Sequence, residues 1–294
     1  METYAFSNAT NHMNYYFKFY KFILSLAAVA LLVAQPLSAQ SNNRVSVPLT
    51  DPSRPVTLRA HLVAGSITVK GADVKEVLVE ARNRGGEDDS DHDSRGNGMK
   101  RIPMTSTGLN IEADNNQVRI STDSTQRATD LIITVPIHTS LSLHTVNDGN
   151  ISVSGVDGEL DVNDVNGEVD LKNVAGSVVA HALNGHVVVT MTRIDPQKPM
   201  AFSSLNGDID VTFPADLKAN VSMRTDNGEV YSDFDVKLVA NAPQQTVQDD
   251  RQKGGKYQVK IDKNVRGTIN GGGQDIQFKN FNGNIYIRKA GASK

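Results

Sequence analysis

The chain has 294 residues, 38% of them hydrophobic and 5% aromatic, and it contains neither Cys nor Trp. Its 30 Lys and Arg residues nearly balance its 33 Asp and Glu residues, so the formal net charge is −3. This balance offers no basic surface for nucleic acid, and the lack of Cys excludes disulfides and a lipid anchor on an N-terminal cysteine.

Residues 1–39 are predicted to be a signal peptide. Two lysines precede the apolar run from Phe22 to Ala34, and small residues follow it up to Ala39. This is the pattern of a cleaved secretory signal, and thirteen apolar residues are too short to span a bilayer comfortably. We therefore expect export to the periplasm, the cell surface or the medium, with no stable membrane insertion after cleavage, and one domain over residues 40–294.

The first part of the mature chain alternates apolar and polar residues, as in "VTLRAHLV", "GSITVKG" and "KEVLVEA". Such alternation predicts short, half-buried strands. Residues 83–101 show no apolar periodicity and predict a polar loop, after which "LNIEA", "QVRIST" and "DLIITVPI" predict further strands. Because apolar residues nowhere recur convincingly at helical spacing, we predict an all-β protein.

The first polar loop carries Asp89, Asp91 and Asp93 at alternate positions, as a calcium-binding loop does. Ser94 and Lys100, however, stand where the EF-hand pattern requires glycine and glutamate. We interpret the segment as a solvated acidic loop, with weak calcium binding as the alternative.

From Gly149 to Gly185 a glycine recurs every nine residues. The segments "GNISVSGVD", "GELDVNDVN", "GEVDLKNVA" and "GSVVAHALN" share apolar residues at their third, fifth and eighth places. The third and fifth places point to one face of a strand, whereas the eighth requires a corner. The pattern predicts a β-solenoid whose inward residues are Ile151, Val153, Val156, Leu160, Val162, Val165, Val169, Leu171, Val174, Val178, Ala180, Leu183, Val187 and Val189.

Asn-Gly pairs set the length of a full coil, because they are spaced 18, 22 and 21 residues apart. Nine residues are then half a coil, and the glycines alternate between two corners. Asn and Gly both tolerate the left-handed conformation of a tight corner, and stacked Asn side chains can hydrogen-bond along the column. The predicted corner residues are Asn166, Gly167, Asn184, Gly185, Asn206, Gly207, Asn227 and Gly228.

The C-terminal part contains a second polar loop, residues 238–256, and then returns to strand patterns. The stretches "DLIITVPIHTSLSLHTV", "NGEV", "LNGDIDVTFP", "DNGEV" and "INGGGQDIQFKNFNGNIYIRK" resemble the bacterial putative-adhesin family, whose members are exported β-solenoid domains of largely unassigned function. The opening "GSITVKGADVKEVLVEARN" is similar to that family's first strands, so the resemblance covers roughly residues 45–290. It implies a right-handed parallel β-helix, for which the Asn-Gly spacing gives coils of about 18–22 residues, and an envelope or surface role, and it brings no catalytic residues.

The residues that follow the Asn-Gly glycines are expected to form an outward column of Glu168, His186, Asp208 and Glu229. Carboxylates that flank an imidazole could bind a divalent metal. We interpret the column as a solvated face and predict no metal or other cofactor, with the metal site as the alternative.

Asp170 and Asp210 are expected two coils apart on one face, about 9.6 Å by the stacking distance, with Val188 between them. This separation is near the upper end for the carboxyl pair of an inverting glycosidase. We interpret both as solvated and keep an enzyme acting on polysaccharide as the alternative.

Other side chains give weaker signals. His144 and His181 are interpreted as structural. The mature chain has only Tyr231, Tyr257 and Tyr286 as tyrosines, so a glycan would be bound mainly by polar groups. The sequence thus favours an exported, non-enzymatic, adhesin-like protein that binds or scaffolds an envelope polysaccharide or protein. A self-assembling solenoid that grows end to end through the apolar "FNGNIYIRK" is the third hypothesis.

Overall fold

The computed structural model describes residues 44–84, 108–122, 128–239, 245–249, 257–261 and 264–291. Every regular element in these ranges is a strand, which confirms the all-β prediction. Within the same ranges there is no helix long and apolar enough to cross a membrane. The predicted signal peptide and the three aspartates of the acidic loop lie outside the described residues.

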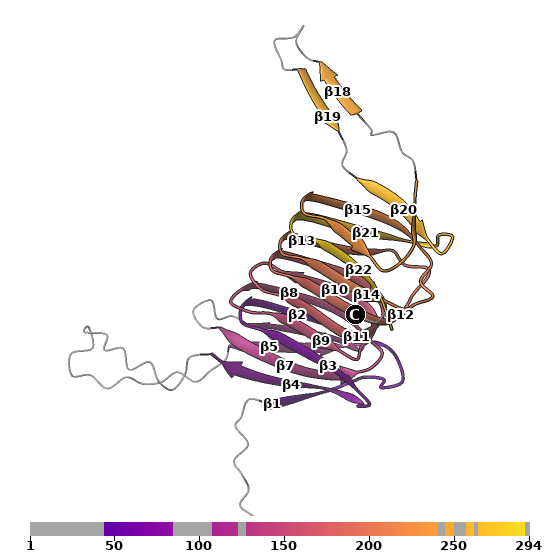
Figure 1. Cartoon of the computed structure of the whole chain (residues 1–294). Coiled ribbons are helices and arrows are strands. Elements are labelled where there is room, and N and C mark those ends of the chain that lie inside the picture. Colours follow the sequence, from indigo (N-terminus) through magenta and orange to yellow (C-terminus); the bar gives the residue numbers. More distant parts are fainter. Residues whose placement is uncertain are drawn as a thin grey trace, which may run out of the picture. The chain divides into compact units, whose positions relative to one another are not determined.

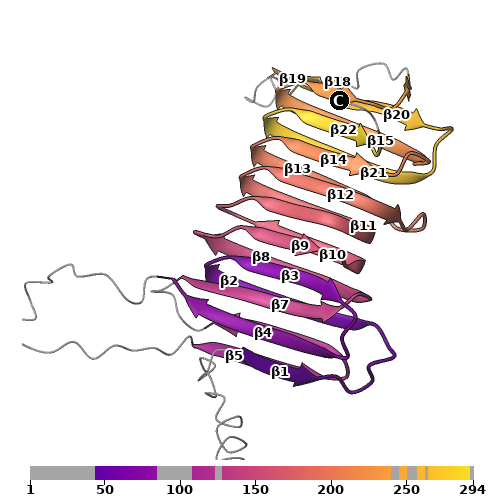
Figure 2. The ribbon, with the colours of Figure 1, turned by 60° about the horizontal axis from the view of Figure 1, so that its bottom comes forward.

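The strands form two faces of a stack, as rungs that follow one another in Figures 1 and 2. The first face contains, in stacking order, β5 (Leu109–Asp114), β6 (Gln117–Thr122), β2 (Val56–Ala64), β8 (Thr139–Asn147), β10 (Asp157–Asp164), the second half of β11 (Val169–Asn184), β13 (Met200–Asn206), β21 (Gln274–Asn282), β15 (Ala219–Asn227), β20 (Val265–Ile269) and β17 (Val236–Leu238).

The second face contains β1 (Arg44–Pro48), β4 (Glu76–Asn83), β7 (Thr129–Pro136), β3 (Ile67–Ala72), β9 (Ile151–Ser154), the first half of β11, β12 (Val187–Ile194), β14 (Ile209–Phe213), β22 (Ile285–Lys289) and β16 (Val230–Ser232). β18 (Gln245–Asp249) and β19 (Tyr257–Ile261) pair only with each other, as an antiparallel hairpin.

Neighbouring rungs in the middle of both faces pair in parallel. The outermost pairs are antiparallel at both ends of the first face and at the β1 end of the second face, whereas β22 and β16 at its other end pair in parallel. Gly158 lies opposite Gly176, 18 residues on, and Asn184 lies opposite Asn206, 22 residues on. These offsets equal the predicted coil lengths. The longer one accommodates the polar insertion "TRIDPQKPM".

The rungs do not stack in chain order. The first coil, β2–β3, lies between the coil of β6–β7 and the coil of β8–β9. The last coil, β21–β22, lies between β13–β14 and β15–β16. The stretch "FNGNIYIRK" is therefore inside the stack, which removes the basis for end-to-end growth through it.

The core fills the space between the two faces with aliphatic side chains and one aromatic cluster. Phe202, Phe213 and Phe278 contact one another there at ring-centroid distances of 5.4–6.4 Å. All predicted inward residues are buried except Val165 and Leu183, which are half-buried.

Those two predictions were wrong because the strands continue one residue farther before the corner. Period-two alternation carries on through β10 and β11, so Asp164 and Ala182 point inward instead. The two kinds of corner therefore differ. The apolar residue at the eighth place of the repeat is buried at one kind, as Val156 and Val174, but only half-buried at the Asn-Gly kind, as Val165 and Leu183.

The predicted corner asparagines form a continuous amide ladder, in which each side-chain Nδ2 donates to the Oδ1 of the next coil. The ladder runs Asn227 to Asn282 (2.9 Å), Asn282 to Asn206 (2.7 Å), Asn206 to Asn184 (2.8 Å), Asn184 to Asn166 (2.9 Å) and Asn166 to Asn147 (3.2 Å).

The reason predicted for the corner glycines was mostly wrong. Among the predicted corner residues only Gly207, with a φ of 152°, leaves the region that other residues adopt. What these corners require is space, because a Cβ on Gly185 would lie 2.0 Å from the carbonyl oxygen of Gly167. Glycine is needed there for the close approach of successive coils.

Candidate functional site: the outward faces of the stack

The predicted outward column starts as expected and then departs from chain order. Glu168, His186 and Asp208 follow the ladder from coil to coil, but the neighbour of Asp208 is Asn284, because the last coil is inserted there. Glu229 comes one coil later. The expected contact between Asp208 and Glu229 is therefore absent from the stack.

The side chains of this column bind backbone amides of the next coil. The Nδ1 of His186 accepts from the amide of Asp208 (2.9 Å), and an Oδ1 of Asp208 accepts from the amide of Asn284 (2.8 Å). No group of three or more metal-ligating side chains gathers anywhere in the described ranges. These side chains stabilise the corners, because the Nδ1 of His186 and the Oδ1 of Asp208 each already accept a hydrogen bond from a backbone amide.

The two carboxylates of the enzyme hypothesis occupy their predicted positions. Asp170 and Asp210 both lie opposite Val188, on its two sides. Asp170 forms an ion pair with Lys172 (2.5 Å), and Arg288 donates to both oxygens of Asp210 (2.6 and 2.8 Å). These pairs give each carboxylate a cationic partner.

Tyr231 and Tyr286 form a feature that sequence reasoning missed. Their rings stack with centroids 5.3 Å apart and planes at 9°, and the guanidinium of Arg288 lies 5.2 Å from the ring centre of Tyr286. A hydrogen bond to Glu229 raises the pKa of Tyr231. Fifty-five residues separate the two tyrosines in the chain, and only the inserted last coil brings them together.

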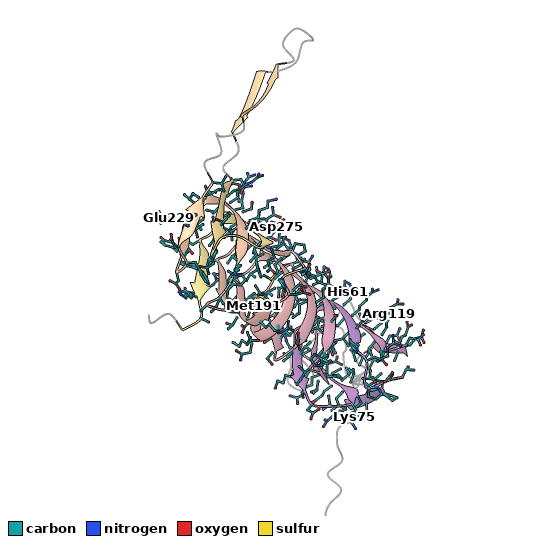
Figure 3. All side chains as sticks on the ribbon, turned by 90° about the vertical axis from the view of Figure 1, so that its right-hand side faces the viewer. His61, Lys75, Arg119, Met191, Glu229 and Asp275 are labelled. Atoms are coloured by element: carbon teal, nitrogen blue, oxygen red, sulfur yellow. The ribbon has the colours of Figure 1, made fainter. Side chains whose placement is uncertain are left out.

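The first face is hollowed at two places. A hollow of about 360 Å³ lies over β5, β6, β2 and β8, and its outward lining side chains are Arg59, His61, Asn110, Glu112, Arg119, Ser121, Ser142 and His144. Figure 3 labels His61 and Arg119 close together on this side of the stack. A hollow of about 650 Å³ lies farther along, over β11, β13, β21, β15 and β20, where Asn220, Asp275 and Gln277 contribute polar groups.

Residues 14–271 match the model of the Toastrack DUF4097 family. The chain belongs to the Toastrack DUF4097 family. The match spans most of the chain and confirms the family resemblance inferred from the sequence. No curated protein matches the chain.

Two solved structures resemble this Toastrack chain. One is a putative cell adhesion protein from Clostridium sporogenes, 9% identical, with a TM-score of 0.41 over 84% of this chain and 98% of that chain. The other is a putative adhesin from Bacteroides fragilis, 11% identical, with a TM-score of 0.38 over 84% and 95% of the two chains. Likenesses at this level carry no argument about what the present chain does.

Three histidines of the Toastrack domain, His61, His144 and His181, lie on its first face. His144 stacks on His61 with ring centroids 4.8 Å apart, and burial, followed by the charge of His61, lowers the pKa of His144. The Nδ1 of His181 contacts the Oγ of Ser203 at 2.7 Å, and burial lowers its pKa. His144 is thus part of the smaller hollow, while the structural interpretation of both residues stays a prediction.

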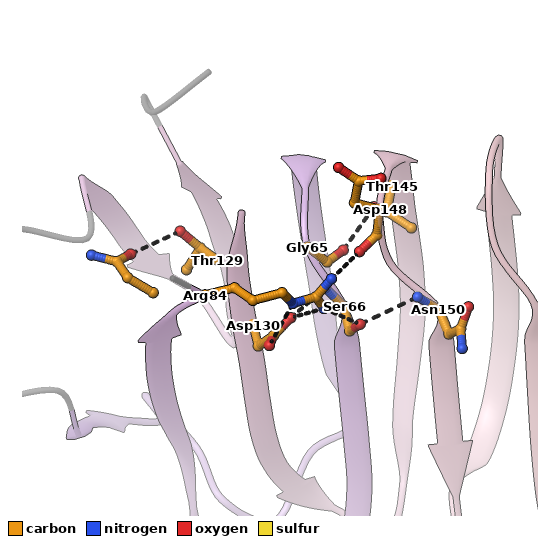
Figure 4. A network of polar contacts seen from close by, with 9 residues as sticks. Gly65, Ser66, Arg84, Thr129, Asp130, Thr145, Asp148 and Asn150 are labelled. Carbon is orange, nitrogen blue, oxygen red and sulfur yellow. Dashed lines mark hydrogen bonds and ion pairs between the residues drawn. The ribbon is translucent and has the colours of Figure 1, made fainter. Parts of the chain in front are cut away.

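A polar network ties three coils together at the N-terminal end of the Toastrack stack (Figure 4). The guanidinium of Arg84 forms an ion pair with Asp130 and donates to the Oγ of Ser66 (2.9 Å) and to the carbonyl of Asp148. Burial acts to raise the pKa of Asp130, but hydrogen bonds from Arg84 and from the amide of Ser66 outweigh it, so the pKa is lowered. The network braces the corner and leaves its carboxylate no free oxygen.

Asp164 is a buried acid in the core, at the corner before Asn166. Its side chain is fully inaccessible, and neither carboxylate oxygen has a hydrogen-bond partner of normal geometry. Burial raises its pKa to about 7, and the nearby amide of Asn166 offsets only part of this effect. The raised pKa of Asp164 comes from burial in the core, where a ligand bound to the outward faces cannot contact it.

Proposed function

We propose that this Toastrack domain is an exported, non-enzymatic, adhesin-like protein that binds or scaffolds a partner in the cell envelope. We propose further that its coils form a right-handed parallel β-solenoid. The parallel pairing of the middle rungs supports this architecture, and connections between parallel strands are right-handed in nearly all proteins.

The observation that carries the functional proposal is the first face with its two hollows. Outward side chains repeat there from rung to rung on strands held by ladders on both sides, which gives an extended and rigid polar surface. Stacked repeats use such continuous surfaces for binding. An envelope polysaccharide, itself a repeating polar polymer, fits this surface, and a protein partner is the other candidate.

The arrangement of the acids supports a binding role over hydrolysis. A glycosidase needs one carboxyl that is protonated and a second that activates water or attacks the sugar. Asp170 and Asp210 instead have Lys172 and Arg288 as partners.

The test is to incubate the purified protein with a panel of envelope polysaccharides and to measure both retention and polymer chain length. We expect at least one polymer to be retained at its original length. Shortened polymer would contradict the non-enzymatic proposal and would direct mutagenesis to Asp170 and Asp210. Neither retention nor shortening would redirect the search to protein partners.

A further inference from the structure

We propose that the smaller hollow of the first face binds an acidic group, a carboxylate or a phosphate, carried by an envelope polymer. We call this hollow the arginine groove and define it by Arg59, Arg119, His61, His144 and Glu112. The inference rests on the proposed binding function and adds the place and the chemical class of the ligand.

Strand pairing brings two arginines side by side in this groove. Arg59 on β2 and Arg119 on β6 are direct partners across parallel strands, and both side chains are exposed on the outward face. Like charges at directly opposed positions repel each other. An anion between the two guanidiniums would relieve this repulsion.

The two groove arginines lack the carboxylate partner that several other arginines of the described ranges have. Arg84, Arg193, Arg224 and Arg288 each form an ion pair with a carboxylate. Within the described ranges, by contrast, the two groove arginines form no ion pair. Glu112 lies opposite Arg119 on the antiparallel partner strand, yet the two side chains do not pair.

The shape of the groove suits a charged group on a larger molecule. Ser121 and Ser142 have short side chains and lie beside the long side chains of Arg59 and Arg119, so the floor between them stays low. Guanidinium groups bind carboxylate and phosphate in a bidentate manner, and serine hydroxyls add further donors. The volume of about 360 Å³ accommodates one acidic residue of a polymer.

His144 gives the groove a pH dependence of known sign. Its imidazole adds a positive charge beside the arginines when it gains a proton, so an anion binds more tightly as the pH falls. The pKa of His144 is lowered by burial and by His61, while Asp161 opposes the shift. The charged and titratable groups that face His144 are His61 and Arg59 from β2, Arg119 from β6, Glu112 from β5 and Asp161 from β10.

The test measures binding of the purified protein to polygalacturonate, to polyphosphate and to neutral dextran. The variant is the double substitution Arg59→Gln with Arg119→Gln. The matched control is Lys70→Gln with Lys75→Gln, which removes the same charge from two exposed lysines away from the groove (Figure 3 labels Lys75). All four side chains are exposed, so thermal unfolding is expected to be unchanged.

We expect the wild type to bind one or both acidic polymers, and the arginine variant to bind about tenfold more weakly or worse, since charge-assisted hydrogen bonds are lost. The lysine control is expected to stay within about twofold of the wild type, because it leaves the arginine hydrogen bonds intact. Binding to polygalacturonate alone would assign the carboxylate, and binding to polyphosphate alone the phosphate. Tighter binding at pH 5.5 than at pH 7.5, abolished by His144→Gln, would support the groove as the site.

Equal losses in the arginine variant and the lysine control would overturn the proposal, because they would show binding by overall charge. Retention of dextran only, or of acidic polymers by both wild type and arginine variant alike, would also overturn it. Either result leaves the proposed binding function standing. Failure of the wild type to bind any polymer in the larger panel would count against that function itself.

Discussion

Asp164 occupies a place where the neighbouring coils put a hydrogen-bond donor. In four other coils the residue at this inward position donates to the carbonyl of a corner glycine in the adjacent coil. The donors are Thr145 to Gly65 (3.0 Å), Ser204 to Gly185 (2.9 Å), Asn280 to Gly207 (2.9 Å) and Thr225 to Gly283 (2.9 Å). An ionised carboxylate cannot donate, whereas a protonated one can.

We expect Asp164→Asn to stabilise the protein by about 1–3 kcal/mol at pH 8, because the amide can donate as that of Asn280 does. The acid titrates near 7 when folded, against 3.8 as its ordinary value, so the folded state holds the proton more tightly. The contribution of Asp164 to stability therefore falls as the pH rises from about 4 to about 7.

The measurement is thermal unfolding of wild type and variant between pH 4 and pH 8. The difference in stability is expected to be smallest at pH 4 and to grow with pH. A matched substitution, Asp161→Asn, lies on the outward side of the same strand and is expected to leave the curve nearly unchanged. A pH-independent difference for Asp164→Asn would show that the carboxyl is not protonated in the folded protein.

The sequence predicted most inward residues of the glycine repeat but not this one. Period-two alternation identifies Leu160 and Val162 from their apolar character, and both are buried. Asp164 continues that alternation, yet an acid followed by the apolar Val165 suggests an outward residue and then an inward one. The strand stays straight for one residue more before the corner, so Asp164 points inward and Val165 does not.

At the scale of the element, the corner glycines set how closely coils can stack. The carbonyl of each corner glycine lies about where the next coil's glycine would carry a Cβ. A larger residue would have to push two coils apart along a ladder whose spacing is fixed by backbone hydrogen bonds on both faces.

We expect Gly185→Ala to destabilise the protein by about 3 kcal/mol or more, since its Cβ would meet the Gly167 carbonyl at 2.0 Å. The control is Gly271→Ala, at a turn where φ is 87° and nothing lies within 4 Å of the added carbon. Its cost is expected to be only the backbone strain, about 1–2 kcal/mol. Chemical denaturation of both variants gives the comparison, and equal costs would contradict the close-approach explanation.

The part of the asparagine ladder from Asn166 to Asn206 could be predicted because its asparagines recur at the spacing of one coil. The place of Asn282 between Asn206 and Asn227 could not. Nor could the tyrosine pair and the arginine groove. Tyr231 and Tyr286, like Arg59 and Arg119, lie at sequence separations that match no coil length, so their contact depends on which coils are neighbours.

At the scale of the whole molecule, the inserted coils decide those neighbours. The coils of the glycine repeat share one apolar pattern and one kind of Asn-Gly corner, so the pattern does not distinguish one neighbouring coil from another. The periodic pattern therefore gives the length of a coil but carries no information on stacking order. Hydrophobic pattern predicted the solenoid, and the order depends on long-range contacts between strands far apart in the chain.

We expect a truncation before Val265 to unfold β15 and β16, because it removes β20, β21 and β22, the strands that pair with them. Amide hydrogen exchange over residues 219–232 measures the loss of protection. The matched control replaces β18, β19 and the connection between them with a short linker, which leaves every ladder of the stack intact. Full protection of residues 219–232 in the truncated chain would mean that coils stack in chain order.

The burial of β22 between β14 and β16 also determines how the molecule responds to force. A strand at the edge of a sheet peels away one hydrogen bond at a time when it is pulled. A pull on the chain just after β22 would have to slide this strand past two partners at once, so many hydrogen bonds share the load before the first one breaks. Because the last coil is inserted, the strand that first bears the tension is paired on both sides and is not a weakly held edge strand.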